Sequence, residues 1–224
     1  EVSQWMHKVL KRKKVDIQTD TMAAEIDDEY ILVSIGVEGN SSGFGLKKIG
    51  IEIGSNNHII VDKNGKTNLD NIYAVGDVIG PPWLAHVSSS EGLYVVEHIA
   101  KLSPKKIDYD CVPACTYSKP EIGSIGLSQK ILDERGIDYK VVKSFFNANG
   151  KAVASDSTEG FIKILVSDRN QILGAHIIGS NATEMISEFS LAMSNNLSVE
   201  NILDSIHPHP TFSEAIFETL MQLR

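Results

Sequence analysis

The sequence has little cysteine, no excess of basic residues and no long apolar run. Two cysteines in 224 residues do not make a disulfide scaffold, so a reducing compartment is expected. The absence of 18 consecutive apolar residues excludes a transmembrane helix and predicts no membrane partner. A net charge of −8 argues against nucleic acid, whose phosphates need a basic surface. The acidic balance instead favours a basic protein partner through electrostatic steering.

The first residues also lack an initiating methionine and the layout of a signal peptide. We therefore expect the chain to begin partway through a longer gene product. Apart from these absences, 42% hydrophobic and 22% charged residues are typical of a globular protein with a sizeable core.

Residues 1–107 show alternating helical and extended patterns. The nearly continuous apolar run at 30–35 indicates a strand buried on both faces. Asn64-Gly65 is a strong hairpin signal. A stretch rich in Gly, Ser and Asn at 39–45 is a candidate domain crossing. The predicted elements are a helix with Val2, Trp5, Met6, Val9 and Leu10 on its apolar face, strands at 15–20 and 30–35 joined by the short link Met22–Glu29, strands at 58–62 and 71–75 on either side of the turn, and a helix from about Leu84 to Lys101.

From Asp108 onward the pattern changes, after a linker at 103–106. Short strands come first and helices dominate from Ala182 to the end, which suggests an α+β domain with a mostly antiparallel sheet. The connection Asp168–Gln171 has hairpin length. The predicted strands lie at 113–117, 139–146, 161–167 and 172–179.

Two short elements carry chemistry, and the first is a strand followed by Gly76 and Asp77. Glycine allows close backbone approach, and a carboxylate at the C-terminal end of a strand is well placed to bind a ribose or ribityl hydroxyl. An aspartate that caps the following turn explains the same pattern. Spacing alone leaves both interpretations open.

The second element is His207-Pro-His209-Pro-Thr-Phe-Ser-Glu214. Proline restricts the residue before it, so these histidines cannot lie in a regular helix. Thr211 or Ser213 is a candidate cap for the last helix, with Glu214 in its first turn. An imidazole that a carboxylate orients can act as a general base, which would make His209 the base and Glu214 its partner. A His-x-His metal pair and two structural histidines remain as alternatives.

The stretch TNLDNIYAVGD, residues 67–77, resembles the second FAD-binding motif of the pyridine nucleotide-disulfide oxidoreductases. The resemblance implies that Asp77 binds the ribityl chain of FAD, with Gly76 beside it. Trp83-Leu84-Ala85-His86 resembles the Met-Leu-Ala-His segment of dihydrolipoamide dehydrogenases, which places Leu84, Ala85 and His86 at the flavin pyrimidine. Helix N-terminal N–H groups stabilise an electron-rich ring there.

HPHPTFSE likewise resembles the His-Ala-His-Pro-Thr-Leu-Ser-Glu element of dihydrolipoamide dehydrogenases. The resemblance implies that His209 is the acid–base, that Glu214 orients it, and that the His209–Pro210 bond is cis. The base would deprotonate a dihydrolipoyl thiol, because the thiolate is the attacking species. Pro208, where alanine is commoner in the family, leaves these roles intact.

Cys111 and Cys115 invite assignment as a redox disulfide, but the family's redox pair has four intervening residues and lies on a helix near the N-terminus. Here three residues intervene, in the segment that corresponds to the first strand of the family's interface domain. Residues four apart on a strand are too far apart to bridge. We expect both thiols to be inert.

The resemblance extends over the whole chain but over roughly the C-terminal half of the family's length. The fold class expected is an α/β Rossmann-like remnant followed by an α+β dimerisation domain with an antiparallel sheet. Residues 1–38 would end an NAD-binding domain, 39–104 would be the second segment of the FAD-binding domain, and 105–224 would form the dimerisation domain. Gly36 is carried over as a cofactor contact in the NAD domain, with Val37 where many members have arginine.

The activity implied is dihydrolipoyl dehydrogenation, with electrons passing through a disulfide and FAD to NAD⁺. The redox cysteines and the G-x-G-x-x-G fingerprints are not in this sequence, so the chain alone is expected to be inactive. Implied partners are a second copy in a homodimer, and the lipoyl and subunit-binding domains of the dihydrolipoyl acyltransferase. The expected compartment is cytoplasmic, or the mitochondrial matrix. A glutathione-reductase-like enzyme and a non-catalytic dimerisation module are the alternatives.

Overall fold

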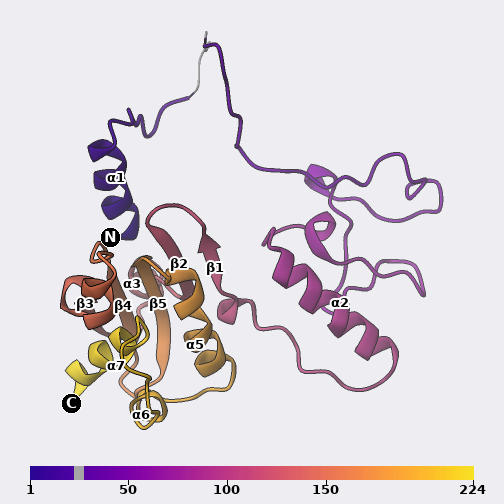
Figure 1. Ribbon diagram of the computed structural model, residues 1–224. Coiled ribbons are helices and arrows are strands. Elements are labelled where there is room, and N and C mark those ends of the chain that lie inside the picture. The colour runs from indigo at the N-terminus through magenta and orange to yellow at the C-terminus, as the bar shows by residue number, and fades with distance from the viewer. Residues whose placement is uncertain (23–27) are drawn as a thin grey trace. The chain divides into compact units, whose positions relative to one another are not determined.

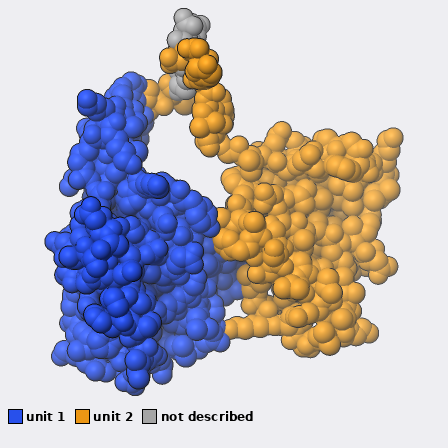
Figure 2. All heavy atoms as spheres, viewed as in Figure 1, with its two compact units in different colours: residues 1–20, 108–224 blue, residues 21–107 orange. Residues whose placement is uncertain are grey.

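The computed structural model describes residues 1–22 and 28–224, which form two compact units (Figure 1, Figure 2). The first unit consists of Glu1–Asp20 and Asp108–Arg224, and the second of Thr21–Ile107. In the part of the chain that the structure describes, no helix has the length and apolar character needed to cross a membrane. The predicted short link at Met22–Glu29 falls largely outside the described residues.

The first unit holds most of the regular structure. Its helices are α1 (Val2–Arg12), α3 (Gln129–Arg135), α4 (Gly150–Ala154), α5 (Ala182–Ser194), α6 (Val199–Leu203) and α7 (Glu214–Leu220), and its strands are β1 (Ala114–Thr116), β2 (Glu121–Gly126), β3 (Lys140–Phe145), β4 (Phe161–Val166) and β5 (Ile172–Gly179). The second unit holds α2 (Ala85–Ile99) and two short 3-10 helices, Ser55–Asn57 and Gly76–Ile79.

The five strands form one sheet in the order β1-β2-β5-β4-β3, and every neighbouring pair is antiparallel. The antiparallel sheet expected from the sequence is therefore confirmed. The hairpin predicted at Asp168–Gln171 joins β4 to β5, which lie in the middle of the sheet (Figure 1). The helices predicted after Ala182 are also present.

Both faces of the central strands are buried. Every residue of β4 is buried, and side chains alternate between the two faces of a strand. Ile162, Ile164 and Val166 join the main hydrophobic cluster, to which α5 and α7 contribute. Phe161, Lys163 and Leu165 therefore point to the opposite face, which a different element must cover.

Helix α1 covers part of that opposite face. The Trp5 ring packs edge-on against Phe161, with 5.5 Å between ring centroids, and Val9 is buried. The Glu1 carboxylate accepts hydrogen bonds from Lys163 Nζ at 2.8 Å and Lys143 Nζ at 3.2 Å. The apolar stripe predicted for this helix thus packs on the sheet of the first unit.

One strand of this unit, β2, and two of its helices, α3 and α4, were not predicted from the sequence. Strand β2 contains two glycines, and at Gly123 a β-carbon would lie 2.4 Å from the carbonyl oxygen of Ala182. Glycine is needed there because the start of α5 passes directly over the strand, so the usual alternation of side chains is lost. Helix α3 is capped at its start by Ser128, whose hydroxyl accepts from Ile131 N, and at its end by Gly136 with φ 63°.

Four strands predicted for residues 1–107 are wrong. Residues 15–20 and 30–35 form no strand, and Leu32 and Ile35 are more than 90% exposed instead of buried on both faces. At 58–62 and 71–75 the structure has only the isolated bridges Ile53–Ile59 and Lys66–Tyr73. A strand needs a continuous ladder of hydrogen bonds to a neighbour. At 58–62 and 71–75 the described residues form only scattered backbone hydrogen bonds, such as Ile60 N to Glu52 O and Ala74 N to Gly65 O.

The predicted Asn-Gly turn and the second helix of this region are confirmed. Asp62 N donates to Lys66 O across the turn, and Gly65 has φ 73°. Helix α2 begins and ends close to the predicted bounds. The assignment of 1–38, 39–104 and 105–224 to three domains stays a prediction.

Candidate active site

The histidine–glutamate pair predicted near the C-terminus is formed. His209 Nδ1 lies 2.8 Å from Glu214 Oε1, and the other carboxylate oxygen accepts the backbone N–H of Thr211 at 2.8 Å. Glu214 is the first residue of α7, where a helix favours negative charge. The His209–Pro210 peptide is cis, as expected.

The surroundings of Glu214 keep it ionised. The backbone N–H of Thr211 is the largest cause that lowers the pKa of this carboxyl, and the hydrogen bond from His209 adds to it. An ionised carboxylate only accepts hydrogen bonds, so His209 donates through Nδ1. Nε2 is then left as the acceptor, and the His209 side chain is 78% exposed. The arrangement is that of an oriented base whose reactive nitrogen faces outward.

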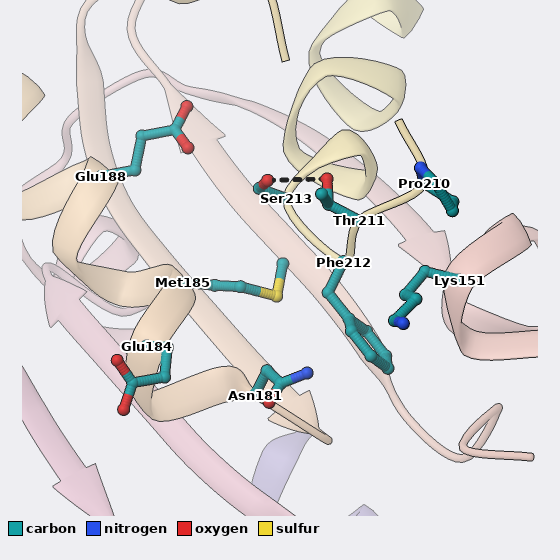
Figure 3. Close-up of a pocket in the computed structure, with 9 residues that line it drawn as sticks. All are labelled: Lys151, Asn181, Glu184, Met185, Glu188, Pro210, Thr211, Phe212 and Ser213. Atoms are coloured by element: carbon teal, nitrogen blue, oxygen red, sulfur yellow. Dashed lines mark hydrogen bonds between the residues drawn. The ribbon is translucent and has the colours of Figure 1, made fainter. Parts of the chain in front are cut away.

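Helix α7 has a predicted residue at its N-cap position but not the predicted capping hydrogen bond. Ser213 is at the N-cap position, but its hydroxyl makes no capping bond. It instead pairs with Thr211 Oγ1 at 2.9 Å (Figure 3). Thr211 Oγ1 in turn donates to the carbonyl oxygen of Pro208 at 2.7 Å. The three hydroxyl and carbonyl groups stiffen the turn that holds His209.

A pocket of about 370 Å³ opens beside this turn (Figure 3). Met185 of α5 and Phe212 of the loop before α7 supply apolar surface, and Glu184 and Glu188 bring charge. The complete lining is Lys151, Asn181, Glu184, Met185, Glu188, Pro210, Thr211, Phe212 and Ser213.

The two histidines of the His-x-His pattern have different partners. No group of three or more potential metal-binding side chains occurs among the residues that the structure describes. His207 and His209 are each bonded to a separate carboxylate, Glu188 and Glu214. The two histidines therefore do not converge on one point.

The strand–Gly–Asp element lies in the second unit, within the 3-10 helix Gly76–Ile79. Gly76 is buried with φ 78°, and its N–H donates to the buried Glu91 carboxylate at 2.7 Å. The Asp77 side chain is exposed and makes no hydrogen bond or ion pair within the described part of the chain. A capping aspartate would accept such a bond, whereas the role of Asp77 as a flavin contact stays a prediction.

The segment at 84–86 forms the start of α2, as expected. Leu84 is the N-cap in extended conformation, and the N–H groups of Val87 and Ser88 both donate to its carbonyl oxygen. Ala85 and His86 are exposed in the first turn. Their position at a helix N-terminus suits an electron-rich group.

Gly36 is not brought to either element by a described contact. It is exposed with φ 116°, and a β-carbon there would meet no atom within 4 Å. Its role as a cofactor contact stays a prediction. The remaining site residues form two groups, one in each unit.

Both cysteines are free, which confirms that they form no disulfide. Cys111 lies in the 3-10 helix Tyr109–Cys111 and not in the strand, whereas Cys115 lies in β1. Burial raises the pKa of the Cys115 thiol, which suits an unreactive side chain.

Two family models match most of the chain. Residues 1–92 match the pyridine nucleotide-disulphide oxidoreductase model, and residues 112–220 match the model of the family's dimerisation domain. The chain therefore belongs to the pyridine nucleotide-disulphide oxidoreductase family, as the motifs predicted.

Curated relatives of the chain include several dihydrolipoyl dehydrogenases. A dihydrolipoyl dehydrogenase of Bacillus subtilis (strain 168) is 39% identical over 99% of this chain and 51% of its own length. The mitochondrial dihydrolipoyl dehydrogenase of Bos taurus is 40% identical over 92% of the chain and 41% of its own length. The chain thus spans about half the length of the curated relatives it matches.

Solved structures agree on the fold. LpdA of Mycobacterium tuberculosis superposes with a TM-score of 0.79 at 27% identity, covering 84% of this chain and 41% of that one. The flavoprotein disulfide reductase RclA of Escherichia coli gives 0.89 at 22% identity, covering all of this chain and 55% of that one. The second likeness concerns the fold alone.

Sequence reasoning missed the carboxylates that support the predicted residues. Glu91 lies on the same buried stripe of α2 as Val87 and Val95, four residues from each. A charged residue on an apolar stripe is a signal that was available. Glu188 on α5 is 19 residues from His207, and no spacing rule connects them.

Proposed function

We propose that the chain is the part of a dihydrolipoyl dehydrogenase that carries its acid–base residue and some of its flavin-binding residues. The observation that carries the proposal is the oriented His209–Glu214 pair in a chain about 40% identical to proteins of that name. WLAH and HPHPTFSE also favour this enzyme over a glutathione-type reductase.

The residues of the second unit fit a flavin. Asp77 offers a carboxylate with no described partner, and the preceding Gly76 packs closely on Ser88 of α2, where a β-carbon would lie 2.9 Å from Ser88 Oγ. Leu84, Ala85 and His86 form the start of α2, where the helix dipole favours an electron-rich group. Asp77 would hold the ribityl hydroxyls of FAD and the helix start would face the pyrimidine. Bound FAD would supply two-electron transfer between a disulfide and NAD⁺.

His209 moves the protons in this proposal. Nε2 accepts the proton of a dihydrolipoyl thiol, and the cation that forms is stabilised by the Glu214 carboxylate 2.8 Å from Nδ1. The thiolate attacks a redox disulfide, which becomes two thiols as the dihydrolipoyl group becomes lipoyl. Two electrons pass on to NAD⁺, which takes up one proton, and a second proton is released.

The proposed assembly is a homodimer, supported by the match to the dimerisation-domain model at 112–220. His209 would serve the flavin site of the other subunit. The lipoyl and subunit-binding domains of a dihydrolipoyl acyltransferase are the proposed further partners, and the charge of −8 favours a basic docking domain. The proposed compartment is the cytoplasm, with the mitochondrial matrix as the alternative.

The test is an anaerobic visible spectrum of the polypeptide as its gene encodes it, before and after dihydrolipoamide is added. We expect a flavin spectrum that develops a thiolate–flavin charge-transfer band, and no response to reduced glutathione. A flavin that responds only to glutathione would show that the enzyme is a glutathione-type reductase instead. The absence of flavin would contradict the proposal. The 224-residue chain alone should show no turnover, in keeping with a dimerisation module.

A further inference from the structure

The first unit contains a second histidine–carboxylate pair that the proposed chemistry does not use. His207 Nε2 lies 2.9 Å from Glu188 Oε1, and only 9% of the His207 side chain is exposed. Glu188 belongs to α5, which packs in the main hydrophobic cluster. The pair therefore ties the loop before α7 to a helix of the core.

His207 has two further contacts that fix its ring. Nδ1 lies 3.2 Å from the carbonyl oxygen of Ser205, and the ring centroid is 5.8 Å from that of Phe217 in α7. Carbonyl and carboxylate oxygens are both acceptors, so the doubly protonated ring satisfies both and the neutral ring satisfies one. His207 thus contacts α5, its own loop and α7 at once.

His209 has no comparable anchor. Its ring is exposed, and within the described chain its one hydrogen bond goes to Glu214. The ring's position is therefore set by the backbone on either side. After His209, the N–H of Thr211 is bonded to Glu214. Before it, His207 is the side chain that is fixed to the core.

We infer that His207 and Glu188 are positioning residues: they hold the loop from Asp204 to Ser213 against α5, so that His209 meets Glu214 through Nδ1 and presents Nε2 outward. The inference rests on the proposed function for the role of His209 alone. The geometry that it predicts belongs to this chain and needs neither flavin nor substrate.

The test is ¹⁵N spectroscopy of the 224-residue chain labelled at histidine, because imidazole ¹⁵N shifts report which ring nitrogen carries the proton. His207→Phe keeps a ring against Phe217 and removes both hydrogen bonds. Glu188→Gln keeps the shape and removes the charge. Glu184→Gln is the matched control, since Glu184 lies one turn earlier on α5 and lines the same pocket without a described bond to His207.

We expect the Nδ1–H form of His209 to dominate in the unsubstituted chain and in Glu184→Gln. In His207→Phe the ratio of the Nδ1–H to the Nε2–H form should fall by about fivefold, which corresponds to one average hydrogen bond of about 1 kcal/mol. Glu188→Gln should lower it in the same direction. Glu214→Gln gives the ratio expected when the His209 ring no longer has a carboxylate partner.

Unchanged ratios in both His207→Phe and Glu188→Gln would overturn the inference. If His207→Phe does not fold, as judged by the amide signals of β4, the isosteric Glu188→Gln decides alone. In the polypeptide as encoded, the same substitutions should lower kcat for dihydrolipoamide and leave KM unchanged. A changed ratio with an unchanged kcat would refute His209 as the base and leave the positioning role in place.

Discussion

Individual residues at the candidate site depend on backbone partners that lie close to them in the chain. Glu214 stays ionised because the N–H of Thr211 donates to one oxygen, which leaves the other oxygen for His209. Both partners fall within five residues, so residue type and spacing predicted the pair correctly. Asp77 and Gly76 were located in the same way, since the chemistry of glycine followed by a carboxylate is local.

The supporting contacts at this scale could not be predicted in the same way. Glu91 is 15 residues from Gly76 and Glu188 is 19 residues from His207. Each pair forms because a helix packs against a turn, and no short spacing encodes that packing. Glu91 alone left a trace in the sequence, as an acid on the buried stripe of α2.

Gly76→Ala should destabilise the second unit by about 1–3 kcal/mol. Gly76 has φ 78°, a conformation that alanine adopts with strain, and the new β-carbon would lie 2.9 Å from Ser88 Oγ. Hydrogen exchange of the α2 amides measures the change. Ser88→Ala combined with Gly76→Ala should recover the part due to the Oγ contact, and leave the part due to φ and to the Ser88 β-carbon at 3.1 Å. Unaltered exchange in Gly76→Ala would contradict the prediction.

At the scale of elements, helices were predicted better than strands. Helices α1 and α2 follow from apolar spacing and from signals in their own residues, whereas a strand exists only with a neighbour. The runs at 15–20 and 30–35 have strand-like composition and no pairing partner among the described residues. Strand β2 shows the reverse case. Its glycines interrupt the alternation of apolar and polar side chains, but it is a strand because it pairs with β1 and β5.

The docking of α1 on the sheet should depend on pH. Hydrogen bonds from Lys163, and then from Lys143, lower the pKa of Glu1 to about 2 from an ordinary value of 4.5. A lowered pKa means that the stabilisation is fully present above pH 4.5 and is lost as the pH falls towards 2. Trp5 lies in the same interface and reports on it.

Fluorescence of a Trp83→Phe chain, which leaves Trp5 as the sole tryptophan, measures this docking. We expect Trp5 emission to shift to the red between pH 4.5 and 2, while circular dichroism follows the sheet separately. Lys163→Met should produce the red shift already at pH 7. An emission maximum that stays constant down to pH 2 would show that the Glu1 contacts do not hold the helix.

For the whole molecule, the two units differ in how much apolar surface they bury. In the first unit β4 and β5 are almost wholly buried, and α5 buries one face with Met185, Ile186 and Phe189. In the second unit the buried apolar side chains are few, namely Ile51, Ile59, Val87 and Val95. Its helix α2 leaves Leu93, Val96 and Ile99 more than half exposed. These three residues recur every three positions and therefore lie on one side of the helix.

Hydrogen exchange should therefore separate the units in the 224-residue chain. We expect β4 and β5 amides to exchange only through global unfolding, and α2 amides to exchange at least about tenfold faster through local opening. Mass spectrometry of peptides covering 85–99 and 161–179 measures the difference. Equal protection of both peptides would contradict the prediction and would indicate a single cooperative unit.

The sequence by itself determined the family, the two chemistry-bearing elements and the antiparallel domain, because each depends on residues that lie near one another in the chain. Only the tertiary structure decided which carboxylates support Gly76 and His207, where α1 packs, and which apolar runs become strands. Those outcomes depend on contacts between distant segments. A strand pattern becomes a strand, and a lone acid becomes a partner, only when folding brings the complementary group within hydrogen-bond distance.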